Sequence, residues 1–179
     1  MTQYFAGIGS RKAPPNILKI MTKITQELCS RGYVLRSGGA AGCDTAFQEG
    51  APEDQMEIYL DAMHKRKQCI DGWYNVRYLD NEQEANEIAE QYHPAWNKLG
   101  AKAKALISRN TYQVLGMDLN TPSEFVICWT PDGATTTTTR ESGGTGQAIR
   151  LAHKRGIKVF NLQREADLQY IMTWLEIQA

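Results

Sequence analysis

The 179-residue sequence lacks the run of about 18 to 20 apolar residues that a membrane-spanning helix needs. Its N-terminus, MTQYFAGIGSRK, lacks the basic segment followed by an apolar segment that marks a secretory signal. It also lacks an excess of either charge, because 20 Lys and Arg stand against 20 Asp and Glu. We therefore expect no membrane partner and a cytoplasmic location. A protein devoted to coating nucleic acid is disfavoured, although a local basic patch stays possible.

The cysteines and histidines lack the spacing of metal ligands. The four cysteines are far apart and form no CxxC pair, and the three histidines form no HxxxH pair. A zinc ribbon and a disulfide scaffold are therefore not expected. We predict reduced cysteines, no metal site and no cofactor.

Short apolar segments alternate with helical patterns along the chain. This alternation predicts a parallel sheet with helices on both faces, joined by right-handed crossovers. We therefore expect one α/β domain of the Rossmann type over residues 1–179, with residues 61–81 as a loop or lid insertion. The expected strands are 4–8, 33–35, 56–60, 125–129 and 158–162, and the expected helices are 15–31, 42–50, 82–99 with an interruption at Pro94, 108–115, 146–155 and 166–177.

Three turns that carry glycines follow predicted strands, at residues 7–11, 37–44 and 142–147. Ligands of open parallel sheets bind at the carboxyl ends of the strands. Glycine lets backbone amides approach an anion, and the helix that follows directs its positive end there. The turns therefore predict a phosphate site, whose expected residues are Gly9, Ser10, Arg11, Ser37, Gly38, Gly39, Asp44, Ser142, Gly143, Gly144, Thr145, Gly146 and Gln147.

The two common nucleotide-binding fingerprints are missing. The sequence has no GxxxxGK[ST] motif, which excludes a P-loop NTPase. The GxG of Gly7 and Gly9 continues to Ala13 and Pro14 without the third glycine of GxGxxG, which weakens a dinucleotide site of the usual kind.

Four motifs follow one another along the chain: GIGSR at 7–11, SGGAAGCDTAFQEGA at 37–51, SRN at 108–110 and SGGTGQAIRLA at 142–152. Together they resemble the SLOG superfamily, which unites DprA/Smf proteins with the LOG nucleoside-monophosphate phosphoribohydrolases. The resemblance covers most of the chain except residues 61–81 and the threonine-rich loop. It implies a Rossmann-like fold and a nucleotide ligand, and it adds Arg109 and Asn110 to the expected phosphate-binding residues.

The same resemblance implies further properties. Small members similar to this chain occur in phage genomes, so the resemblance implies a viral origin and the host cytoplasm as the location. Members commonly assemble, so we expect a homo-oligomer.

The catalytic carboxylate of LOG enzymes has no counterpart here. Aligning the third turn with their PGGxGTxxE motif places Gln147 at the threonine and Arg150 at the glutamate. Glu141 and Asp44 are the main candidates for a general acid or base, and Glu49 and Glu57 are weaker ones. The simpler interpretations are a solvated loop residue for Glu141 and a helix N-terminal residue for Asp44.

Three functions stay open at this point. The first is a protein that binds a small phosphorylated nucleotide, as a sensor or as a sponge that sequesters it. The second is an N-glycosidase that cleaves nucleoside 5'-monophosphates. The third is a DprA-like protein that binds single-stranded DNA, which the neutral net charge disfavours.

The five threonines at 135–139 are expected to form a mobile loop.

Overall fold

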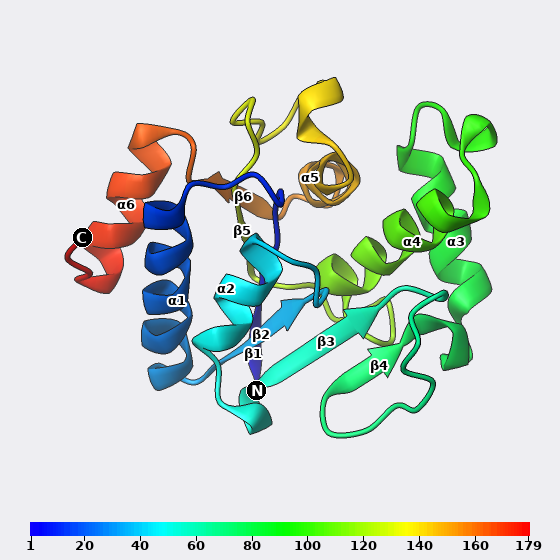
Figure 1. Cartoon of the computed structure of the whole chain (residues 1–179), viewed down its shortest axis with the longest axis horizontal. Helices are drawn as coiled ribbons and strands as arrows, with labels where there is room; N and C mark the ends of the chain where they lie inside the picture. The colour runs from blue at the N-terminus through cyan, green and yellow to red at the C-terminus, as the bar shows by residue number, and fades with distance from the viewer.

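A parallel six-stranded sheet forms the centre of the computed structural model, which describes residues 1–179 (Figure 1). Every pair of neighbouring strands is parallel. This sheet confirms the predicted α/β fold of Rossmann-like type. Its strands are β1 (Gln3–Gly7), β2 (Tyr33–Ser37), β3 (Met56–Leu60), β4 (Trp73–Asn75), β5 (Phe125–Cys128) and β6 (Lys158–Asn161).

The order of the strands is β4-β3-β2-β1-β5-β6, so the chain builds outward from β1 in two directions. Strands β2 to β4 extend the sheet on one side of β1, and the chain then crosses back to place β5 on the other side. The connections that leave β1 and β5 therefore diverge to opposite faces of the sheet. In open parallel sheets this point of reversal is where a ligand crevice forms.

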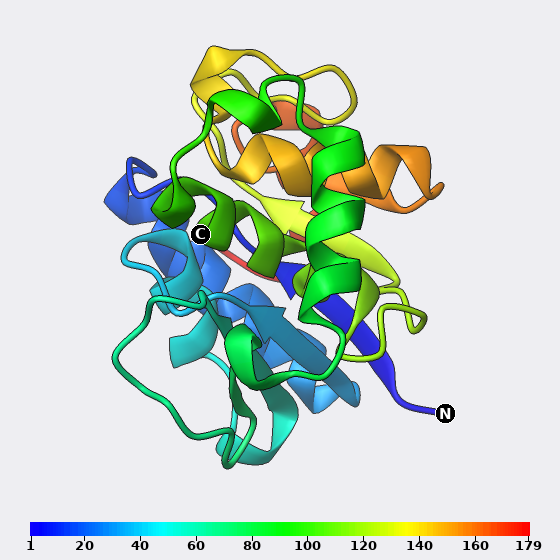
Figure 2. The same ribbon diagram turned by 90° about the vertical axis from the view of Figure 1, so that its right-hand side faces the viewer.

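Helices cover both faces of the sheet (Figures 1 and 2). One layer contains α1 (Pro15–Ser30), α2 (Cys43–Glu49) and α6 (Glu165–Leu175). The other contains α3 (Glu82–Tyr92), α4 (Ala101–Leu115) and α5 (Thr145–Lys154). Two separate apolar clusters result, one under each layer. None of the helices combines the length and the apolar character that a bilayer crossing requires.

Helix α1 shows how the sequence pattern becomes structure. It begins at Pro15, a residue suited to a first helical position because its missing N–H would have no partner there. Ile17, Met21, Ile24 and Leu28 are buried along one face, as the spacing of three and four residues predicts.

The expected insertion at residues 61–81 was wrong in one respect, since it contains strand β4. This strand pairs with β3 from Ile58 to Leu60 and forms one edge of the sheet. With three residues, Trp73–Asn75, it is too short to show a period-2 pattern. Only pairing with a neighbour identifies it as a strand.

Two helix boundaries also differ from the expectation. Helix α4 begins at Ala101 rather than at residue 108. Its first turns were not predicted, because the segment AKAKAL shows no apolar stripe of its own. Helix α3 ends at Tyr92, two residues before Pro94, because the residue before a proline disfavours helical backbone.

The threonine run, expected to be a mobile loop, is hydrogen-bonded in the structure. The Thr139 hydroxyl donates to Asp132 over 2.6 Å, and Thr138 accepts from Arg150 over 2.7 Å. Burial opposes ionisation of Asp132, but hydrogen bonds from Ser142, Thr139 and Thr130 outweigh it and hold its pKa below the usual range. The loop is therefore organised around the Asp132 carboxylate, which lies seven residues before Thr139 and ten before Ser142 in sequence.

The close packing at the end of β1 gives a stability test. A Cβ at Gly7 would lie 2.6 Å from Phe47 Cγ and 2.9 Å from Leu35 Cδ1, so Gly7→Ala forces the core apart. We expect it to lower the free energy of unfolding by about 1 to 3 kcal/mol in urea titrations. Gly100→Ala is the matched control, because a Cβ there has no neighbour within 4 Å. Equal stability of the two variants would contradict this account of the core.

Candidate functional site

A cleft of about 470 Å³ lies at the carboxyl ends of β1 and β5, where the order of strands reverses. All three glycine turns reach it, as the sequence predicted. The first turn contributes Gly9, Ser10 and Arg11, the second contributes Ala40 and Asp44, and the third contributes Gly144 and Thr145. Helix α4 closes the remaining side with Lys102, Leu106, Arg109, Asn110 and Gln113.

The first turn is fixed by contacts with β5 and α2. The Ser10 N–H donates to the Trp129 carbonyl over 3.0 Å, and the Cys43 thiol contacts the Ser10 carbonyl over 3.0 Å. A Cβ at Gly9 would lie 2.6 Å from the Cys43 sulfur, so this close approach requires glycine. The rigid turn holds Arg11 at the rim of the cleft, where its side chain is exposed.

In the second turn, one polar side chain stabilises the fold and another lines the cleft. The buried Ser37 hydroxyl donates to the Gly7 carbonyl over 2.6 Å, and Ser37 does not line the cleft. Asp44 lies in the cleft wall and accepts from the Ala40 N–H over 3.2 Å. Its carboxylate is 3.8 Å from Arg109, whose Nη1 donates to the Gly38 carbonyl over 2.6 Å.

Burial raises the pKa of Asp44 to about 6, although Arg109 and the Ala40 N–H favour the ionised form. The side chain is almost fully buried, so the loss of hydration outweighs one cation at 3.8 Å. Asp44 therefore changes its charge in the cleft near pH 6. A protonated Asp44 removes the only negative side chain that lines the cleft.

The third turn offers backbone more than side chains. A short helix over Arg140–Ser142 precedes it, with Ser142 buried against Thr139. Gly144 and Thr145 begin α5 at the cleft, and the Asn110 amide donates to the Gly144 carbonyl over 2.8 Å. Glu141 is exposed and does not line the cleft.

Arg150, which occupies the position of the LOG glutamate, contributes nothing to the cleft. It donates to the Tyr92 carbonyl over 2.6 Å and to Thr138 over 2.7 Å. In this structure Arg150 therefore joins α5 to α3 and to the threonine loop.

One face of α4 supplies side chains that sequence reasoning missed. Lys102, Leu106 and Gln113 follow a spacing of three to four residues together with Arg109. The expected helix began at 108, so Lys102 and Leu106 lay outside it. A helix drawn from 101 would have placed all of them on one face.

Two buried amides in this region have no hydrogen-bond partner. Gln113, which lines the cleft, is 1% exposed, and neither its Oε1 nor its Nε2 is paired. Gln147 in α5 is fully buried and is unpaired in the same way, although it does not line the cleft. Buried amides usually have partners, so the unpaired Gln113 marks its part of the cleft lining as a place that can bind a polar group.

The cleft is positively charged although the chain is neutral. Arg11, Lys12, Lys102 and Arg109 line it against the single carboxylate of Asp44. Arg109 is paired with Asp44, whereas the other three cations take part in none of the ion pairs of the structure.

The structure thus brings together about half of the predicted site residues. The predicted residues that line the cleft are Gly9, Ser10, Arg11, Asp44, Arg109, Asn110, Gly144 and Thr145. Those that do not line it are Ser37, Gly38, Gly39, Glu141, Ser142, Gly143, Gly146 and Gln147. No group of three or more His, Cys, Asp or Glu side chains is placed to hold a metal ion.

The position of Asp44 predicts a pH dependence of stability. Its pKa is raised from 3.8 to about 6 on folding, so the protonated form stabilises the fold and this contribution is lost as the pH rises from 4 to 6. The loss amounts to roughly 2 to 3 kcal/mol. Asp44→Asn stays neutral and keeps an acceptor for the Ala40 N–H. In urea unfolding between pH 4 and 7, its stability relative to the parent is expected to rise across this interval.

Glu141→Gln is the control for the loss of an acidic side chain, since Glu141 is exposed outside the cleft. If Asp44→Asn and the parent change in parallel from pH 4 to 7, Asp44 does not titrate as the structure indicates.

Comparison with known proteins adds to this geometry. The family model for DNA recombination-mediator protein A matches residues 1–59, which contain the first two glycine turns. No curated protein matches the sequence.

Two solved structures share the fold. DNA processing protein A from Helicobacter pylori, described for its mode of binding single-stranded DNA, is 20% identical with a TM-score of 0.54. The match covers 97% of this chain and 80% of that one. DprA from Streptococcus pneumoniae is 19% identical with a TM-score of 0.48, over 90% of this chain and 50% of that one. The chain thus spans about half the length of the Streptococcus protein.

The chain is therefore similar to DNA recombination-mediator protein A in sequence over residues 1–59, and it shares a Rossmann-like α/β fold with the Helicobacter pylori protein over 97% of its length.

Proposed function

We propose that the chain binds single-stranded DNA through backbone phosphates held in the cleft at the carboxyl ends of β1 and β5. The observation that carries this proposal is the convergence of three glycine turns with three unpaired cations, Arg11, Lys12 and Lys102. The neutral net charge disfavoured this function in the sequence. The charge of the cleft, rather than that of the chain, is the relevant quantity for a local phosphate contact.

The start of α5 is the part of the cleft best suited to a phosphate. The first N–H groups of a helix have no partner within the helix and lie at its positive end. Gly144 carries no side chain there, and Thr145 adds a hydroxyl. Ser10 and Arg11 line the same cleft and can contact the same anion.

The lining indicates which part of DNA is held. No aromatic side chain lines the cleft, so stacking of bases, a common feature of single-strand sites, is not available in it. Phosphates contacted by amides and cations are then the main source of affinity. This arrangement favours binding with little dependence on base sequence and a strong dependence on salt. The family description and the single-strand binding of the Helicobacter pylori protein support the same proposal.

A small phosphorylated nucleotide, bound by a sensor or sponge, is the second candidate function. The unpaired, buried amide of Gln113 in the cleft lining favours it, because such a group suits a base edge or a ribose hydroxyl. Hydrolysis of that nucleotide would depend on Asp44, the only carboxylate in the lining.

One incubation separates these functions. Purified protein is mixed with a nucleotide panel, and the filtrate and the denatured protein are analysed by chromatography and mass spectrometry. An intact nucleotide recovered from the protein supports the second candidate, and free base beyond one equivalent shows an N-glycosidase. A panel left unchanged, together with binding of a labelled oligonucleotide, supports the proposal.

Assembly into a homo-oligomer stays a prediction.

The cations of the cleft predict the salt dependence of DNA binding. Arg11→Gln and Lys102→Gln each remove one exposed positive charge from the lining. Each is expected to weaken binding of a labelled oligothymidylate several-fold and to reduce the slope of log K against log salt by about 0.7. Fluorescence anisotropy at four salt concentrations measures both quantities.

Lys19→Gln is the matched control, because Lys19 is exposed on α1 and does not line the cleft. A slope reduced equally in all three variants would show that the contacts are diffuse and would contradict the proposed site.

The glycine at the start of α5 predicts an effect on binding without an effect on folding. Gly144 has φ −62° and ψ −28°, which any residue adopts, and a Cβ there has no neighbour within 4 Å. Gly144→Ala is therefore expected to leave the melting temperature unchanged. It should weaken DNA binding, because the methyl group limits the approach of phosphate to the N–H groups of α5. Unchanged affinity would show that this turn does not contact DNA.

A further inference from the structure

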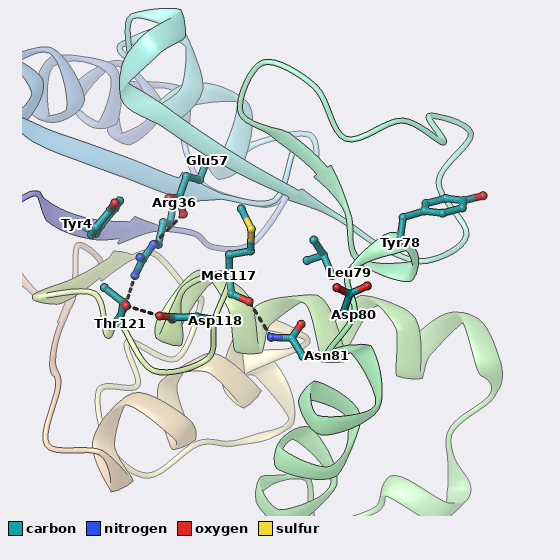
Figure 3. Close-up of a pocket in the computed structure, with 10 residues that line it drawn as sticks. All are labelled: Tyr4, Arg36, Glu57, Tyr78, Leu79, Asp80, Asn81, Met117, Asp118 and Thr121. Atoms are coloured by element: carbon teal, nitrogen blue, oxygen red, sulfur yellow. Dashed lines mark hydrogen bonds and ion pairs between the residues drawn. The ribbon is translucent and has the colours of Figure 1, made fainter.

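A second cavity, of about 490 Å³, lies away from the glycine turns (Figure 3). It is bounded by Tyr4 and Glu57, which lie near the starts of β1 and β3, and by Met117 and Asp118 in the connection from α4 to β5. It shares no lining residue with the cleft described above. None of the functions considered so far uses it.

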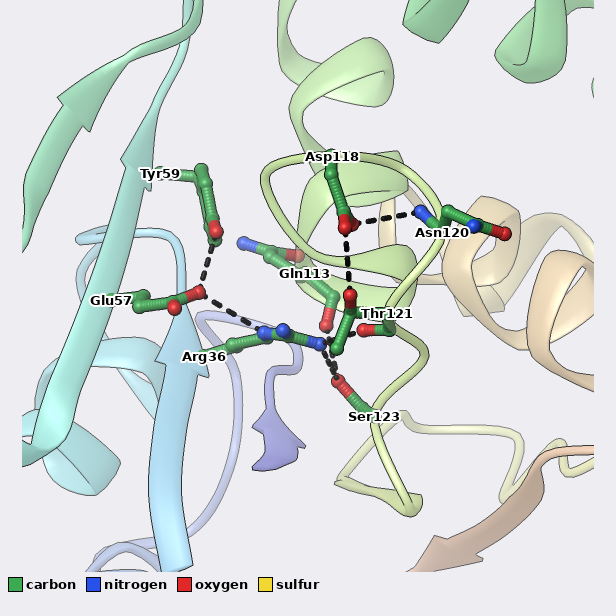
Figure 4. Close-up of polar contacts among 8 residues, drawn as sticks. All are labelled: Arg36, Glu57, Tyr59, Gln113, Asp118, Asn120, Thr121 and Ser123. Atoms are coloured by element: carbon green, nitrogen blue, oxygen red, sulfur yellow. Dashed lines mark hydrogen bonds and ion pairs between the residues drawn. The ribbon is translucent and has the colours of Figure 1, made fainter. Parts of the chain in front are cut away.

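An ion pair forms part of the wall of this second cavity. Arg36 is 2% exposed, and its Nε donates to Glu57 Oε2 over 3.1 Å. Its Nη1 donates to the Thr121 carbonyl over 2.6 Å, and its guanidinium lies 3.8 Å from the centre of the Tyr4 ring. The Tyr59 hydroxyl donates to the same Glu57 oxygen over 2.6 Å (Figure 4). The charge of Arg36 is therefore already used within the protein.

Some carboxylate oxygens in the same cavity have no hydrogen-bond partner in the chain. Both hydrogen bonds that Glu57 accepts go to Oε2, so Oε1 has no partner in the chain. Asp80 forms no hydrogen bond and no ion pair, and its carboxylate is exposed. Hydrogen bonds from the Asn120 N–H and the Thr121 hydroxyl lower the pKa of Asp118, which keeps that group ionised. Three carboxylates thus stand against one arginine, an excess of two negative charges.

Two exposed apolar side chains lie beside these carboxylates at the rim of the cavity. Tyr78 is 52% exposed and Met117 is 37% exposed. They are two of only six large apolar residues exposed in the protein, and both line this one cavity. Exposed apolar side chains that line a charged pocket are found at surfaces that bind another protein.

These features favour one class of occupant. A phosphate would meet two excess negative charges, and no group of three metal ligands is present. A guanidinium or ammonium group can instead be held by the free carboxylate oxygens. The exposed Tyr78 and Met117 suit apolar residues on either side of such a group in a polypeptide.

We propose that this cavity binds an arginine or lysine side chain of a partner protein, with Tyr78 and Met117 contacting the apolar residues that flank it. The site is independent of the DNA cleft. Variants of one are therefore expected to leave the other unchanged.

The test uses the full chain labelled with ¹⁵N and the blocked peptide acetyl-Leu-Arg-Leu-amide. Saturable shifts are expected in the amides of residues 78–81 and 117–121. The same peptide with citrulline, which keeps the shape of arginine without its charge, should bind about tenfold more weakly. Asp80→Asn should weaken the arginine peptide about threefold.

Glu90→Gln, an exposed change elsewhere on α3, is the control and should leave peptide binding unaltered. Equal binding of the arginine and citrulline peptides, or no saturable shift, would overturn the proposal. Ethylguanidinium that binds as tightly as the arginine peptide would also overturn it, in favour of a site for a small cation. Oligothymidylate affinity measured on the same Asp80→Asn sample shows separately whether the DNA cleft functions.

Discussion

The pairing of β1 with strands on both of its sides is the constraint on which the rest of the structure depends. Because β1 lies between β2 and β5, the chain must leave β1 toward one face and return from the other. Parallel pairing then brings the carboxyl ends of these strands to one edge of the sheet. The three glycine turns, which are far apart in sequence, meet there without any direct bond between the first and the third.

This arrangement also separates charge along the sheet. Cations line the cleft at the carboxyl ends, whereas carboxylates are in excess in the cavity near the starts of β1 and β3. A chain with 20 basic and 20 acidic residues can therefore present two surfaces of opposite sign. Net charge describes solubility and long-range attraction, but it gives no information on a contact made within a few ångströms.

The buried ion pairs differ in what they do at these two surfaces. Arg109 and Asp44 are 3.8 Å apart, and the pKa of Asp44 stays high because the pair compensates its burial incompletely. Arg36 and Glu57 are in direct contact, and a tyrosine hydroxyl and a backbone carbonyl complete the network. The first pair leaves a titratable group in a cleft, whereas the second fixes a carboxylate with one free oxygen.

The alternation of strands and helices, the parallel sheet and the three glycine turns could be predicted from the sequence, because apolar periodicity and glycine spacing are local properties of the chain. The sequence also indicated Arg11, Asp44 and Arg109, since each lies within a turn or a motif. The three-dimensional structure was needed to show that Lys12, Lys102 and Gln113 share the cleft, that Ser37 and Ser142 form hydrogen bonds within the fold, and that Trp73–Asn75 is a strand. The reason is that side-chain partners and edge pairing depend on segments tens of residues apart, whose contact no local pattern contains.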